Sequence, residues 1–142
     1  MLFYVKILKV RLKQDKNYLI FQKRNFVMTK LKFETEVATL KKFFETYCLD
    51  KHTDLHYKKI SVIYQDTEFD ISLTLCNECK KNIDYSFEKL QNCPHEIKPR
   101  CRKCPNPCYE KYEWKQVAKV MKYSAIKLSL STIKSKVFKI FN

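Results

Sequence analysis

Residues 76–108 read CNECKKNIDYSFEKLQNCPHEIKPRCRKCPNPC and hold six of the seven cysteines of the 142-residue chain. Two C-x-x-C pairs lie in this stretch, Cys76 with Cys79 and Cys101 with Cys104. A two-residue gap lets both sulfur atoms of a tight turn point at one tetrahedral ion, so the spacing is typical of a metal site. The stretch therefore predicts a domain whose centre is held together by metal–thiolate bonds.

The ligand arithmetic predicts two tetrahedral sites, because seven cysteines and one well-placed histidine make eight ligands. We favour a first site in which the C-terminus of a helix meets a C-x-x-C turn, made of Cys48, His52, Cys76 and Cys79. The second site takes the other four thiols, Cys93, Cys101, Cys104 and Cys108. In an alternative, crossed partition, the two C-x-x-C pairs share one ion. We interpret His95 as a solvated loop residue, with service as a substitute ligand as the alternative.

Zinc suits both ligand sets, so the expected cofactor is one or two zinc ions per chain. A set of four thiolates also suits an iron–sulfur cluster, which is the alternative cofactor. Elemental analysis and a visible spectrum of protein purified without oxygen separate the two, because a colourless protein with two zinc ions excludes the cluster.

Composition excludes several classes of protein. The chain contains no glycine, which phosphate-binding loops, dinucleotide-binding loops and nucleophile elbows require. It contains no run of 18 apolar residues, so we expect no membrane span. We find no signal-peptide pattern and therefore expect a cytoplasmic protein, in which clustered cysteines indicate metal ligands rather than disulfides.

The net charge of +14 lies at the two ends of the chain. Residues 1–27 carry seven Lys/Arg and one acid, and residues 115–142 carry seven Lys and no acid. The segment between them has fifteen Lys/Arg and fourteen acids, so it is close to neutral. The basic C-terminal helix is therefore the candidate surface for a nucleic-acid or protein partner.

The patterning predicts a mainly α fold, a small helical domain pinned by one or two Cys-rich metal sites, with a β-hairpin insertion. Apolar residues at helical spacing predict helices over 35–48 and 77–91, and alternation predicts a hairpin within 53–75. All four prolines fall in 94–107, where we expect an irregular loop. Asn106 and Pro107 then predict the start of a third helix that ends near residue 123.

A last helix is predicted over 126–141, with an apolar stripe flanked by lysines. Such a helix either packs on the domain, which we favour, or lies on a membrane surface. The expected organisation is an N-terminal extension (1–27), a Cys-rich metal-binding domain (28–125) and a basic amphipathic C-terminal helix (126–142). We interpret the extension as upstream sequence that is not native, because Met28 leads directly into the first helix; a tryptic peptide from residues 1–22 of the endogenous protein would exclude this.

Five short motifs resemble the nitrous oxide-stimulated promoter family (YgbA-like), and the resemblance covers about residues 34–125. In chain order they are Tyr47-Cys48 with His52, Leu75-Cys76-x-x-Cys79, Tyr85 with Leu90-x-x-Cys93-Pro94, Lys98-Pro99-x-Cys101-x-x-Cys104-Pro105-x-x-Cys108-Tyr109, and Val120-Met121-Lys122-Tyr123-Ser124. The chain departs from the family pattern at Lys51, at Arg100, after Ser124, and in the insertion at 53–75. The resemblance implies a cytoplasmic role in the response to nitric oxide or other nitrosative stress, with the cysteines as metal ligands.

The functional prediction is a metal-binding, non-enzymatic protein of this stress response. The alternative is a zinc-dependent nucleic-acid-binding or regulatory protein that uses its basic ends, whose affinity would fall steeply with salt. An enzyme is less favoured, because a catalytic zinc keeps an open position and these sulfur-rich sets are fully subscribed.

Overall fold

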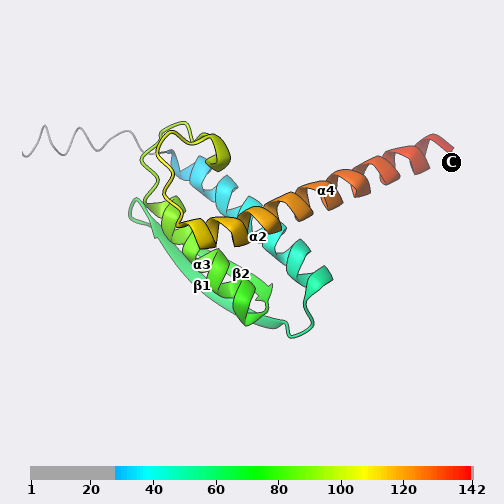
Figure 1. The fold of residues 1–142 in the computed structure, drawn as a ribbon, viewed down its shortest axis with the longest axis horizontal. Coiled ribbons are helices and arrows are strands. Elements are labelled where there is room, and N and C mark those ends of the chain that lie inside the picture. Colours follow the sequence, from blue (N-terminus) through cyan, green and yellow to red (C-terminus); the bar gives the residue numbers. More distant parts are fainter. Residues whose placement is uncertain (1–27, 142) are drawn as a thin grey trace, which may run out of the picture.

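The computed structural model describes residues 28–141 of the chain. The N-terminal extension expected at 1–27 lies outside the described residues. The described elements are three α-helices, one short 3₁₀ helix (η1, Cys101–Lys103) and two strands, in the order α2, β1, β2, α3, η1 and α4. The prediction of a mainly α protein with a hairpin therefore agrees with the architecture (Figure 1).

Helix α2, Lys30–Lys51, is the central element and contacts α3, α4 and β2. It begins because the Thr29 hydroxyl caps it, accepting a hydrogen bond from the Lys32 amide at 3.2 Å. It ends at His52, whose extended backbone still donates its N–H to the Cys48 carbonyl. The buried side lies at three- and four-residue spacing and consists of Phe33, Val37, Leu40, Phe44, Tyr47 and Cys48. The helix is longer at both ends than the predicted 35–48.

The predicted hairpin is confirmed as an antiparallel pair, β1 (His56–Tyr64) and β2 (Thr67–Leu75). The strands pair from His56 opposite Leu75 to Tyr64 opposite Thr67, which leaves a two-residue turn. Both turn residues, Gln65 and Asp66, have positive φ angles of 47° and 60°. Two-residue hairpin turns use this conformation because its twist matches that of the strands. The turn is thus built without glycine.

Helix α3, Asn77–Gln91, has the predicted bounds. Its N-cap is Cys76, whose sulfur accepts a hydrogen bond from the Cys79 amide at 3.4 Å. Ile83, Phe87 and Leu90 lie on its buried side. A cysteine that caps a helix holds its sulfur at the positive end of the helix dipole, where a thiolate is stabilised.

Helix α4, Lys111–Phe141, corrects three expectations. It begins four residues after Pro107, because Tyr109 packs edge-on against both Tyr85 and Trp114 and the Tyr85 hydroxyl accepts the Glu110 amide hydrogen bond. It is also one continuous helix, where two helices over about 107–123 and 126–141 were predicted. Its first half packs on α2 and α3. Its second half extends beyond the rest of the protein (Figure 1), so the favoured packing of residues 126–141 on the domain is wrong.

A single hydrophobic core lies between α2, the inner face of the hairpin, α3 and the start of α4. Phe33, Phe44, Leu73 and Ile83 are its largest fully buried apolar side chains, together with Met28. Phe33 stacks on Tyr64 with ring centroids 4.0 Å apart, and the Tyr64 hydroxyl donates to the Met28 carbonyl. The sulfur atoms of the candidate site are part of this same core.

Candidate metal centre

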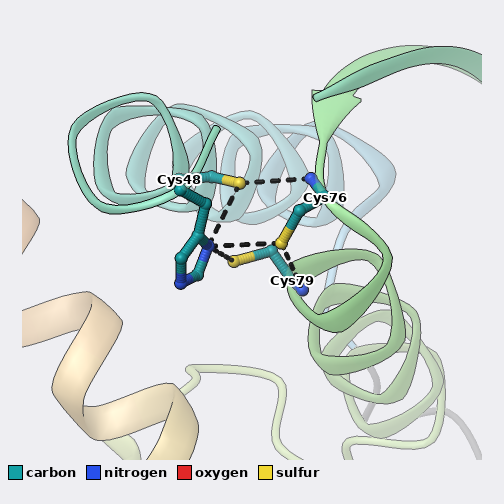
Figure 2. A group of neighbouring side chains, drawn as sticks. Cys48, Cys76 and Cys79 are labelled. Atoms are coloured by element: carbon teal, nitrogen blue, oxygen red, sulfur yellow. Dashed lines mark hydrogen bonds between the residues drawn. The ribbon is translucent and has the colours of Figure 1, made fainter. Parts of the chain in front are cut away.

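The candidate metal centre lies where the end of α2 meets the start of α3. Cys48 comes from the last turn of α2 and His52 caps that helix. The hairpin between them and α3 ends at Leu75, which delivers Cys76 and Cys79 to the same point. Figure 2 shows the sulfur atoms of Cys48, Cys76 and Cys79 pointing toward one another at this junction. Residues 28 positions apart in the chain thus converge because the hairpin folds back on itself.

The donor atoms have the spacing of a tetrahedral ligand set. His52 Nδ1 lies 3.5 Å from the Cys48 sulfur, 3.2 Å from the Cys76 sulfur and 3.4 Å from the Cys79 sulfur. All four donor atoms lie within 4.8 Å of one another. Ordinary zinc–sulfur and zinc–nitrogen bonds at a tetrahedral angle separate sulfur and nitrogen by about 3.6 Å. The four side chains are therefore close enough to hold a metal ion, and their chemistry suits zinc.

Backbone amides support the sulfur atoms from the protein side. The Cys76 amide donates to the Cys48 sulfur at 3.2 Å, and the Cys79 amide donates to the Cys76 sulfur. Such hydrogen bonds favour the thiolate form that binds metals. These amides and the α3 dipole thus compensate part of the negative charge that three thiolates would bring.

Burial works against that charge when no cation is present. Burial raises the pKa of the Cys48 thiol, and burial together with its neighbours Cys48 and Cys76 raises the pKa of the Cys79 thiol well above its usual range. The free thiols of Cys48 and Cys79 are therefore protonated at neutral pH. A metal ion that binds here must displace these protons, so its affinity falls as the pH falls.

The Tyr47 ring is packed between the centre and α4. Its ring meets the His52 ring edge-on at 5.6 Å and the Tyr123 ring edge-on at 5.4 Å. The Tyr123 hydroxyl in turn donates to Asp50 at 2.8 Å, and Lys127 forms an ion pair with the same carboxylate. The imidazole is thus positioned by side chains from both helices.

The remaining cysteines lie around the loop between α3 and α4. Burial raises the pKa of the Cys108 thiol, and the charges of Cys101 and Cys93 raise it further, but these three sulfur atoms do not all lie within 4.8 Å of one another. Lys98 lies close to Cys101 and forms an ion pair with Glu36 at 3.2 Å. Burial lowers the pKa of Lys98, but the negative charges of Cys101 and Glu36 outweigh burial, so the pKa is raised overall. Cys104, in contrast, has His95 Nε2 at 3.3 Å.

The structure brings together one of the two predicted ligand sets. Within residues 28–141, no second group of three or more His, Cys, Asp or Glu side chains has its donor atoms within 4.8 Å of one another. The site of Cys93, Cys101, Cys104 and Cys108 therefore stays a prediction, and the crossed partition receives no support from the observed grouping. Sequence reasoning favoured a solvated role for His95 and so missed its contact with Cys104. Its position two residues after Cys93 was the available signal.

Fold and site together define a small, mainly helical protein built around a Cys₃His cluster that could hold a metal ion. No helix among the described residues is long and apolar enough to cross a membrane. A family comparison then identifies the group: the chain belongs to the nitrous oxide-stimulated promoter family, whose model matches residues 31–134. Searches of curated proteins and of solved structures found no match.

Proposed function

We propose that this chain is a cytoplasmic, non-enzymatic zinc protein of the nitrosative-stress response, in which metal-bound thiolates react with nitrosating agents. The observation that carries the proposal is the convergence of three sulfur atoms on His52 Nδ1 at 3.2–3.5 Å. The family description, nitrous oxide-stimulated promoter, supports the link to nitrogen oxides. Seven free cysteines favour a reducing compartment.

A closed site supports a role without turnover. Three thiols and one imidazole complete a tetrahedral set, which leaves no position for a substrate or a water molecule. When bound, zinc would supply the positive charge that keeps the three sulfur atoms deprotonated at neutral pH despite their burial. The site would then present thiolates, which are the nucleophilic form of cysteine.

The proposed reaction is nitrosation by an agent such as dinitrogen trioxide. The thiolate sulfur attacks the nitrosyl nitrogen, the S–N bond forms, the N–N bond breaks and nitrite leaves with the electron pair. Cys76 is the cysteine we expect to be attacked first, because the residue is 9% exposed against 0% for Cys48 and 1% for Cys79. Losing one thiolate ligand weakens the hold on the ion and loosens the junction of α2 and α3.

We further propose that Cys93, Cys101, Cys104 and Cys108 close around a second ion when it is supplied. Support comes from Cys93 and Cys101, which lie close enough to raise the pKa of the Cys108 thiol. Binding would still have to draw the four sulfur atoms together, and Cys104 would have to leave its contact with His95. An iron–sulfur cluster at these four thiols is the alternative. Protein purified without oxygen should be colourless and carry zinc, and a brown chromophore would refute the assignment of zinc to this site.

The experiment that tests the function exposes the zinc-loaded chain to a nitric oxide donor in air. We expect zinc release, read with a colorimetric chelator, and a mass increase on Cys76 that precedes modification of Cys48 and Cys79. Cys76→Ser should abolish the fast phase of release at this centre. Ser86→Cys, which adds a buried thiol outside the cluster, is the matched control and should acquire no modification. No zinc release together with unmodified cysteines would refute the proposal.

A further inference from the structure

The second half of α4 carries an apolar stripe that the protein does not cover. Ile126, Leu130, Ile133 and Val137 recur at spacings of four, three and four residues, so they lie on one side of the helix. Their exposed fractions are 54%, 54%, 56% and 45%. Isolated exposed apolar residues are ordinary, but a continuous stripe indicates a contact surface.

The stripe faces away from the body of the protein. Ser124 is the last fully buried residue of α4, and its hydroxyl donates a hydrogen bond of 2.6 Å to the Phe43 carbonyl of α2. At about 100° per residue, the stripe residues lie between about 180° and 240° around the helix axis from Ser124. A flat surface can therefore meet the stripe without collision with the domain. In Figure 1 this half of α4 is seen to project beyond the other elements.

Lysines border the stripe on both sides. Lys134 lies on one edge and Lys136 on the other, each about 70–90° from the centre of the stripe. Lys127 lies on the same edge as Lys134 but is paired with Asp50 of α2. The opposite side carries Ser131, Ser135 and Lys139 together with two apolar residues, Leu128 and Phe138. Residues 115–142 contain no acidic residue. Long lysine stems beside an apolar stripe can lie along a lipid boundary while their ammonium groups reach the headgroups.

The charge distribution selects the occupant. A second copy of this chain would bring an equally basic helix, and residues 1–27 carry a net charge of +6, so neither offers the opposite charge. A partner helix is usually paired by flanking charges of both signs that fix its register. A single sign on both edges instead fits a laterally uniform anionic surface. We propose that residues 126–139 dock on an anionic lipid surface, with the apolar stripe in the headgroup boundary and the metal centre held above it.

The test is co-sedimentation of the full chain with vesicles. We expect binding to vesicles that contain about 30% anionic phospholipid and therefore carry a negative surface potential. Binding to vesicles of phosphatidylcholine alone should be weak, and binding to the anionic vesicles should decrease as salt is added. Ile133→Glu places a charge in the stripe. Ser135→Glu makes the same change in charge about 160° away and is the matched control. The stripe variant should bind at least about tenfold more weakly than the control.

Three results would overturn the proposal. Equal binding of the two variants would mean that charge alone attracts the chain. Absence of binding to anionic vesicles at low salt would leave an acidic protein as the occupant. A dimer in solution that Ile133→Glu dissociates would assign the stripe to a second copy. Both substitutions are at exposed positions, so unchanged circular dichroism should verify that the body of the protein stays folded.

Discussion

Replacement of His52 by alanine is the sharpest perturbation of the metal centre, because its Nδ1 lies within 3.5 Å of all three sulfur atoms. The chain offers a matched control in His56, four residues later. The His56 side chain is 55% exposed, and it forms an ion pair with the exposed carboxylate of Asp54. His52→Ala should therefore weaken zinc binding, whereas His56→Ala should leave it unchanged.

The magnitude follows from linkage. Loss of a residue that merely supports a metal ligand costs about 10–100-fold in affinity, so loss of a ligand should cost at least about 100-fold. At a free zinc concentration of 100 times the wild-type Kd, zinc stabilises the wild type by about 2.7 kcal/mol. A variant with a Kd raised 100-fold gains about 0.4 kcal/mol under the same conditions. The difference of about 2.3 kcal/mol corresponds to a Tm lower by about 9 °C for a domain of this size.

The assay is a thermal melt followed by circular dichroism, with and without zinc, in a reducing buffer. The wild type and His56→Ala should show the same zinc-dependent rise in Tm, and His52→Ala should lose most of it. A zinc-dependent rise of equal size in His52→Ala would refute the proposed ligand set. So would a wild-type chain whose Tm is the same after a chelator has removed all metal.

Three further predictions concern other parts of the molecule. Asp66→Gly should stabilise the protein by about 0.5–1 kcal/mol in urea unfolding, because Asp66 has a φ of 60° in the hairpin turn, whereas Asp70→Gly within β2 should destabilise it. The hydrogen bonds from Lys127 and Tyr123 lower the pKa of Asp50, so the contact stabilises the folded state above the ordinary carboxyl pKa of about 4, and this stabilisation is lost as the pH falls through the lowered pKa. The wild type should therefore be more stable than Asp50→Asn at pH 7, and this advantage should vanish in acid. A difference in stability that grows in acid would contradict the prediction. Cys101→Ser should reduce bound zinc by one ion per chain while His52→Ala removes the other, and an unchanged metal content in Cys101→Ser would exclude the second site.

The sequence predicted those parts of the fold in which local pattern and tertiary packing agree. Alternation on both sides of Gln65-Asp66 marked the hairpin, and the bounds of α3 follow from Cys76 and the Pro94 stop. The C-x-x-C spacing and the i, i+4 pair of Cys48 and His52 indicated the four residues that meet at the centre. Each pair of ligands follows from a short-range rule, because its two residues lie on a helix or in a tight turn. The meeting of the two pairs depends on the hairpin that folds back between them.

The misplaced features depend on contacts between distant residues. Asn106 and Pro107 have strong preferences for a helix start, but the packing of Tyr109 between Tyr85 and Trp114 delays α4 to Lys111. The stripe of residues 126–140 predicted a buried face, since periodicity reports that a face is apolar but not what covers it. For the same reason, the spacing of Cys104 could not reveal that His95 would be its neighbour.

The position of the Tyr47 ring has a mechanical consequence. The ring packs against His52 on one side and against Tyr123 on the other. Ser124, the residue after Tyr123, donates a hydrogen bond from its hydroxyl to the Phe43 carbonyl of α2. Helix α4 therefore cannot turn about its own axis without displacing the phenol that faces the imidazole. We expect a rearrangement of the sulfur atoms that moves the His52 ring to move the Tyr47 ring and, through it, the Tyr123 ring on α4. The NMR chemical shifts of the Tyr123 ring would report that movement.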